Sequence, residues 1–66
     1  MTEGDINIII EFSEQGNSVR VMHGRKLLYY ATESSPMHAL RKADSYKAMH
    51  ERQGYRVNII KEKAYS

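Results

Sequence analysis

The stretch DINIIIEF (residues 5–12) decides the fold, because its side chains alternate between apolar and polar and then break the alternation. Apolar side chains recur at every second position, at Ile6, Ile8, Ile10 and Phe12. This is the spacing of a β-strand with one buried face. A strand points Ile9 to the opposite side, so Ile9 raises the question of what the second face of the sheet contacts.

The chain has 66 residues and no cysteine. This length predicts a single domain, residues 1–66, close to the lower size limit for independent folding. Without cysteine, disulfides and thiolate metal sites are excluded, and association is the remaining source of extra stability. No apolar run reaches the about 18 residues of a membrane span, and the N-terminus lacks a signal-peptide pattern. We therefore expect a cytoplasmic protein outside the membrane.

Two further strands are predicted before a helix. The segment SEQGNS favours a turn, because Gly16 and Asn17 tolerate positive φ. The strand over residues 18–23 then points Val19, Val21 and His23 to one face and Arg20 and Met22 to the other. Gly24 leaves two alternatives open: a tight turn into a strand over residues 26–31, which we favour, or a bulge in a longer strand.

The helix has clear signals at both ends. Ser35 is the expected N-cap, Pro36 the first helical residue and Gly54 the glycine that follows the helix. The predicted buried arc is narrow and consists of Ala39, Leu40, Ala43 and Tyr46, with Met37 on its flank. The opposite side carries Arg41, Lys42, Ser45, Met49 and Arg52.

A last strand is predicted over residues 55–61, with Tyr55, Val57 and Ile59 pointing inward and Arg56, Asn58 and Ile60 outward. Residues 62–66 are expected to fray. The fold class is thus α+β, with two layers: a single helix on a mainly antiparallel sheet of three to four strands, in the order ββ(β)αβ.

One helix covers only one face of a sheet, so the other face should be polar in a lone monomer. Here that face receives Ile9, Met22, Ile60 and either Leu28 with Tyr30 or Leu27 with Tyr29. Such a patch is typical of a contact surface. Single exposed isoleucines are also common, and the chain end with Tyr65 could instead cover the patch.

Catalytic and metal-binding patterns are weak. His23, His38 and His50 lack the spacing of metal ligands, and His50 is expected to pack at the helix end. Ser34 and Ser35 fit helix capping, while Glu11 and Glu14 fit a charged hairpin rim. The glycines do not form a phosphate-binding loop. We expect neither an enzyme nor a metal or cofactor site.

The charge is polarised along the chain, although the net charge is only +2. Residues 1–19 hold four acidic and no basic residues, and all ten basic residues follow, against four acidic ones. An acidic partner is therefore expected for the later part. The candidate residues for nucleic acid or an acidic protein are Arg20, Arg25, Lys26, Arg41, Lys42 and Arg52, with Tyr29, Tyr30 and Tyr55 available for stacking on bases.

The segment YATESSPMHALRKADSYKAMHERQGYRV (residues 30–57) resembles the small phage-encoded inhibitors of bacterial RNA polymerase. The likeness lies in strands before a single helix and in a glycine–aromatic–x–valine strand after it. It implies a host-takeover protein that docks on polymerase without catalysis and uses basic residues of the last strand, here Arg56 and Lys61. The helix of this chain is basic, which departs from the acidic contacts of that family.

Together these features predict a non-enzymatic interaction protein of the phage type that binds and modulates a host machine such as RNA polymerase. The apolar contacts are assigned to Ile9, Met22, Tyr30 and Ile60, either with the target or with a second copy in a homodimer. The alternative is a small DNA- or RNA-binding regulator that uses Arg41, Lys42 and Arg52 on the helix.

Overall fold

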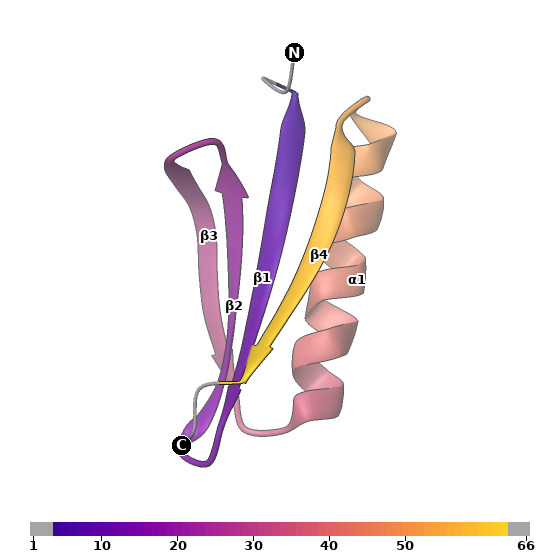
Figure 1. Ribbon diagram of the computed structural model, residues 1–66. Coiled ribbons are helices and arrows are strands. Elements are labelled where there is room, and N and C mark those ends of the chain that lie inside the picture. Colours follow the sequence, from indigo (N-terminus) through magenta and orange to yellow (C-terminus); the bar gives the residue numbers. More distant parts are fainter. Residues whose placement is uncertain (1–3, 64–66) are drawn as a thin grey trace.

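The computed structural model describes residues 4–63, which form four strands and one helix (Figure 1). The elements are β1 (Asp5–Ser13), β2 (Gly16–His23), β3 (Lys26–Glu33), α1 (Pro36–Arg52) and β4 (Arg56–Lys63). The α+β class with one helix on a mainly antiparallel sheet is thereby confirmed, and the sheet has four strands. No helix within residues 4–63 is long and apolar enough to cross a membrane.

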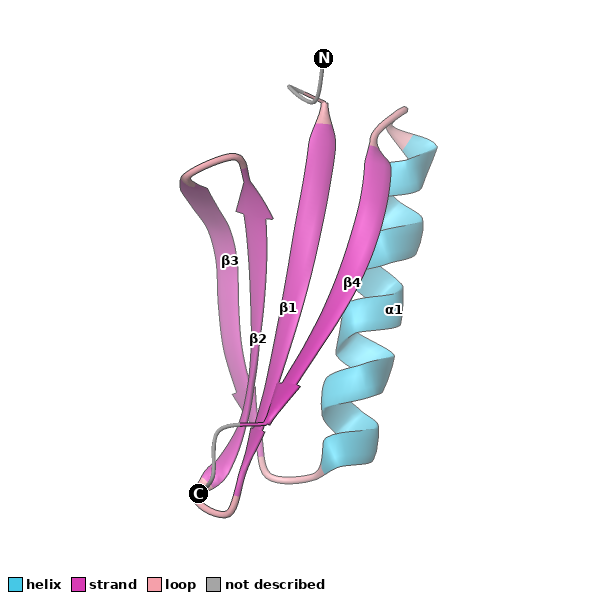
Figure 2. Cartoon of the chain, in the orientation of Figure 1, coloured by secondary structure: helices cyan, strands magenta, loops and turns pink. Residues whose placement is uncertain are grey.

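The strands are ordered β3-β2-β1-β4 across the sheet. β1 pairs antiparallel with β2, and β2 pairs antiparallel with β3, through the two hairpins. β4 pairs parallel with β1, because α1 carries the chain back over one face before β4 begins. Figure 2 shows α1 on a single side of the sheet. The strand order makes β3 and β4 the two edges of the sheet.

The core lies between α1 and the centre of the sheet. Its fully buried members are Ile6, Ile8 and Ile10 of β1, Val19 and Val21 of β2, and Ala39 and Ala43 of α1. Two alanines on the buried side of α1 allow the helix to lie close to three isoleucines of β1. Leu40, Tyr46, Val57 and Ile59 pack around this cluster as predicted. Met37 was assigned to its flank, which is wrong: the side chain is 59% exposed.

Two tight turns connect the first three strands. Gly24 forms a turn between the paired residues His23 and Lys26, and its φ of +65° suits the first central position of a hairpin turn. The favoured alternative at Gly24 is thus confirmed. Gly16 has a φ of +144°, whereas Asn17 lies in β2 with negative φ. Of the two residues that tolerate positive φ, the turn thus uses Gly16. The Asn17 side-chain amide is buried and donates a hydrogen bond to the Glu33 carbonyl, 3.2 Å away.

A bulge interrupts the pairing of β2 with β3. Val21 pairs with Tyr29 and Met22 with Leu27, so Leu28 is an extra residue on β3. Leu28 is partly buried against the core, while Leu27 is exposed. In neither predicted pair, Leu28 with Tyr30 or Leu27 with Tyr29, do both side chains lie on the face away from the helix. The extra residue in the bulge shifts the alternation of the side chains by one position.

The helix begins and ends where the sequence analysis predicted. Ser35 is the N-cap residue and Pro36 opens α1, although the Ser35 side chain makes no capping hydrogen bond. At the other end, Gly54 has a φ of +98°, and its N–H donates to the Glu51 carbonyl at 3.0 Å. The Tyr55 N–H donates to the His50 carbonyl at 3.1 Å, which completes a Schellman motif.

β4 continues to Lys63, two residues beyond its predicted end. Glu62 and Lys63 thus belong to the strand, where Glu62 pairs with Glu11 and Lys63 with Phe12 of β1. The remainder of the predicted frayed end, with Tyr65, lies outside the described residues.

Candidate protein-binding face

The side of the sheet that faces away from α1 is a continuous surface, here called the open face. The strand register places its side chains in rows that cross the sheet. From the start of β1 to its end there are four rows, and each four-residue row is given in the order β3, β2, β1, β4. The rows are Asp5 with Arg56; Leu27, Met22, Asn7 and Asn58; Tyr30, Arg20, Ile9 and Ile60; and Thr32, Ser18, Glu11 and Glu62. The two middle rows contain no lysine and no acidic residue, and these eight residues are the central patch.

Ile9 lies in the central patch, on the side of β1 opposite the core. Its neighbour on β4 is Ile60, which is 41% exposed, and its neighbour on β2 is Arg20. Tyr30, 58% exposed, stands beyond Arg20 at the β3 edge. The predicted apolar residues thus share one face, but Arg20 separates Tyr30 from Ile9.

The second row of the central patch combines an apolar half with an amide half. Leu27 and Met22 are paired neighbours on β3 and β2. Asn7 and Asn58 are paired on β1 and β4, and the Asn58 side-chain amide donates a hydrogen bond to Asn7 Oδ1 at 3.2 Å. The patch is therefore mixed: its polar groups are Arg20 on β2 and the Asn7–Asn58 pair on β1 and β4, and its other side chains are apolar or aromatic.

Arg20 reaches across the sheet over β1. Its Nη2 lies 3.9 Å from Oε1 of Glu62, and β1 separates the two strands that carry them. Because Arg20 is paired with Ile9 in the register, its aliphatic stem lies beside Ile9, which is only partly exposed. The ion pair is long and open to solvent, so it contributes little to stability and leaves the guanidinium available to another carboxylate.

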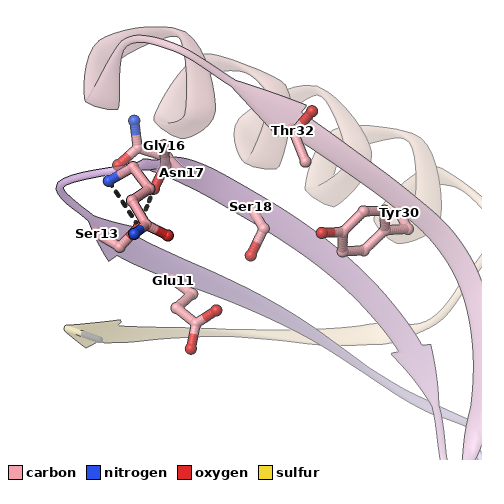
Figure 3. A pocket seen from close by; sticks show the side chains of 8 residues that line it. Glu11, Ser13, Gly16, Asn17, Ser18, Tyr30 and Thr32 are labelled. Carbon is pink, nitrogen blue, oxygen red and sulfur yellow. Dashed lines mark hydrogen bonds between the residues drawn. The ribbon is translucent and has the colours of Figure 1, made fainter. Parts of the chain in front are cut away.

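A shallow polar depression of about 350 Å³ lies on the open face at the end near the β1–β2 turn. Figure 3 shows it between Glu11 of β1, Ser18 of β2, and Tyr30 and Thr32 of β3, with the Tyr30 hydroxyl pointing toward Ser18. The Ser13 hydroxyl is occupied, because it donates to the Gly16 carbonyl at 2.7 Å and accepts from the Gln15 N–H at 3.3 Å. The Ser13 side chain therefore stabilises the turn between β1 and β2.

Arg56 and Lys61 were both assigned to the basic contact of the last strand, but the structure places them on opposite faces. Arg56 pairs with Asp5 on the open face. Lys61 pairs with Ile10 and lines a cleft of about 440 Å³ on the helix side, together with Leu40, Ala43, Asp44 and Ile59. Their separation of five residues is odd, so strand geometry alone forces this result.

The six predicted basic residues fall in three places and form no single strip. Arg20 is on the open face, Arg25 and Lys26 are exposed at the β2–β3 turn, and Arg41, Lys42 and Arg52 are on α1. On α1, Lys42 Nζ lies 3.3 Å from Glu33 Oε2. The β2–β3 turn, the end of α1 and the start of β4 lie at the same end of the molecule (Figure 1). Arg25, Lys26, Arg52 and Arg56, here called the basic pole, belong to these segments, as does Glu51, and Arg56 pairs with Asp5.

A group of aromatic rings lies between the end of α1 and the β2–β3 hairpin, and the sequence prediction did not anticipate it. The Tyr29 ring stacks on the Tyr46 ring, with 5.1 Å between their centroids. The rings of Tyr29 and His50 form a T-shaped contact, with 6.1 Å between their centroids. Tyr55 follows at 6.2 Å from His50 and 5.4 Å from His23. Tyr29 thus belongs to the helix side, and the predicted packing of His50 at the helix end is confirmed.

His50 is 4% exposed, and its Nδ1–H donates to the Tyr46 carbonyl at 2.8 Å. His38 is exposed on α1 beside Arg41 and Lys42, far along the helix from His50. Among residues 4–63, no group of three or more His, Cys, Asp or Glu side chains is arranged to hold a metal ion.

Comparison with known proteins gives no relative. No protein-family model matches this chain, and neither a curated protein nor a solved structure matches it.

Proposed function

We propose that this chain is a non-enzymatic protein-binding module that docks through the central patch of the open face. The observation that carries the proposal is the composition of this patch: Tyr, Arg, Met, Leu, Ile and Asn, with neither lysine nor acidic residues. Tyr, Met and Arg are enriched in the buried centres of protein interfaces, and Lys, Glu and Asp are depleted there.

The surroundings of the patch support the same proposal. Charged residues lie at both ends of the open face, with Asp5 and Arg56 at one end and Glu11 and Glu62 at the other. A centre without lysine or acidic residues, surrounded by a charged rim, fits the usual organisation of an interface. An antiparallel sheet with a solvated face would instead carry polar residues throughout.

The partner that fits is a protein surface with an apolar ridge and a carboxylate placed to meet Arg20. This guanidinium stands in the middle of the patch, and its bond to Glu62 is loose. A desolvated carboxylate on a partner would bind it more strongly than Glu62 does at the surface. Because of the resemblance of residues 30–57 to phage inhibitors of RNA polymerase, bacterial RNA polymerase is the first target to test, and inhibition of transcription is the proposed effect.

The experiment measures binding of the chain to purified bacterial RNA polymerase, together with transcription from a defined promoter. Ile9→Glu places a charge in the centre of the patch, and Ser18→Glu places the same charge on the same face outside it. The expected result is binding and inhibition by the wild type and by Ser18→Glu, with at least about tenfold weaker binding by Ile9→Glu. Equal affinities for the two variants would contradict docking through the patch.

Binding to nucleic acid is the competing outcome, and the basic pole is the feature that would produce it. A titration with random duplex DNA at several salt concentrations separates the two. Steep salt dependence, lost in a variant with Arg25→Glu and Arg52→Glu and unchanged in Ile9→Glu, would assign the function to the pole instead of the patch. The protein-binding proposal predicts no binding to DNA at about 150 mM salt.

A further inference from the structure

β4 is an edge strand that carries charged residues but is protected by neither a proline nor a bulge. It is eight residues long, contains no proline, and pairs with β1 without a bulge. The other edge, β3, is interrupted by the bulge at Leu28, which disturbs the regular spacing of its free backbone groups. A regular edge offers a row of N–H and C=O groups to another strand.

We propose that two copies of this chain associate edge to edge through β4, antiparallel, with the two-fold axis at Ile59. This inference concerns the edge of the sheet and does not depend on the proposed function of the open face. Three features of β4 support this dimer: the alternation of its free backbone groups, the positions of its charges and the cleft beside it.

The free backbone groups limit the possible registers. Along β4, the groups that point away from β1 belong to every second residue. In an antiparallel pair, the residues that exchange hydrogen bonds stand directly opposite each other. When β4 pairs with itself, opposed residues must therefore be an even number of positions apart, so the axis passes through a residue and never between two.

Charge then selects one of the remaining registers. With the axis at Ile59, Arg56 stands opposite Glu62 of the second copy, and symmetry repeats this pair at the other end. With the axis at Lys61, two lysines face each other; with the axis at Ile60, no two charged residues of β4 face each other. With the axis at Asn58, Arg56 faces an isoleucine. Only the register at Ile59 opposes unlike charges, and cross-strand pairs of this kind favour a register.

The cleft on the helix side opens beside the same edge. Ile59 lines it together with Ile10 and Leu40, and Asp44 and Lys61 stand at its polar side. In the proposed register, Ile59 of each copy meets Ile59 of the other, so each copy supplies an apolar side chain at the mouth of the cleft. Val57 faces Lys61 of the second copy, whose aliphatic stem covers the valine.

A two-fold axis perpendicular to the sheet keeps both helices on one side and both open faces on the other. The β4 edge disappears into one continuous sheet, and the two central patches lie side by side. Glu62 changes its partner from Arg20 to Arg56 of the second copy, which frees the Arg20 guanidinium in the centre of each patch.

Sedimentation equilibrium of the full chain tests the proposal, with charge reversals at the two positions. Arg56→Glu and Glu62→Arg each bring like charges together, and each is expected to weaken the dimer at least about tenfold. An equimolar mixture of the two variants opposes unlike charges again and should associate as tightly as the wild type. The double variant Arg56→Glu/Glu62→Arg should also regain the dimer, and Lys26→Glu at the β3 edge should leave it unchanged.

Recovery in the mixture cannot arise within one copy, so it separates the interface from any effect on folding. All of these side chains are exposed, and circular dichroism of each variant verifies that the fold is retained. The proposal is overturned if the wild type stays monomeric at about 1 mM, or if the mixture associates no more tightly than its components.

Discussion

Ile8 and Ile9 are adjacent in the chain but contact different surroundings. Ile8 is fully buried between β2, β4 and α1, whereas Ile9 faces away from the core and contacts Ile60 and Arg20 across the open face. The same side chain therefore stabilises the fold at one position and is available for binding at the next. This difference follows from the two-residue period of a strand.

Alanine substitutions measure the difference directly. Ile8→Ala should lower the free energy of unfolding by about 2–5 kcal/mol, because it leaves a cavity in a packed core. Ile9→Ala should lower it by about 1 kcal/mol or less, since a partly exposed side chain loses less burial. Urea denaturation gives both values. Equal losses would mean that Ile9 is packed as tightly as the core.

His50 is a structural histidine. It is nearly buried, its Nδ1–H is bonded to the Tyr46 carbonyl, and rings of Tyr29 and Tyr55 flank it. His50→Ala is therefore expected to destabilise the fold by about 2–3 kcal/mol. The exposed His38 is the control, and His38→Ala should change the stability by less than about 0.5 kcal/mol. A loss at His50 as small as at His38 would show that the ring cluster adds nothing.

At the scale of elements, the end of α1 sets where β4 begins. Gly54 has positive φ, and the bonds of the Gly54 and Tyr55 N–H groups reverse the chain so that Arg56 can pair with Asp5. The glycine and the apolar periodicity of α1 were both visible in the sequence, which is why the helix bounds were predicted well. The position of β4 was not, because the sequence does not show whether the returning chain pairs with β1 or with β3.

Gly54→Ala should destabilise the protein by about 1–2 kcal/mol, because an L side chain strains the left-handed conformation. Gly4→Ala is the matched control: its Cβ would meet only the Tyr55 Cδ1 at an ordinary distance of 3.9 Å. That variant should stay within about 0.5 kcal/mol of the wild type. Thermal unfolding of both variants checks the prediction, which fails if the two glycines respond alike.

The bulge in β3 could not be predicted from the sequence. The run KLLYYA gives no alternation that distinguishes Leu27 from Leu28, so the outward residue could not be chosen. The extra residue Leu28 places Leu27 and Tyr30 together on the open face, three positions apart. Arg56 and Lys61 are the opposite case, since counting along the strand was enough to separate them.

At the scale of the whole molecule, the protein measures 35 × 20 × 15 Å, a thickness that holds one helix layer and one sheet layer. The single helix, the buried isoleucines and the exposed Ile9 were all predictable from the sequence, because each depends on local periodicity. The crossing of Arg20 over β1 and the gathering of the basic pole depend on contacts between distant segments. No local pattern contains them.

The two proposals assign separate roles to two surfaces of the molecule. The central patch of the open face is proposed to bind a partner, and the β4 edge is proposed to join two copies. Because the proposed axis is perpendicular to the sheet, the dimer would present two patches in one plane, which favours a partner with two sites or an elongated groove.

Tyr29 and Tyr30 allow the most direct test of the central claim that the open face docks a protein. They are adjacent, both are partly exposed, and they point to opposite faces of the sheet. A photo-reactive phenylalanine analogue is placed at either position and irradiated with RNA polymerase or with the partner found by affinity capture. We expect one discrete adduct from position 30, abolished by Ile9→Glu, and none from position 29. Equal adducts from both positions, or an adduct from position 29 alone, would contradict the account.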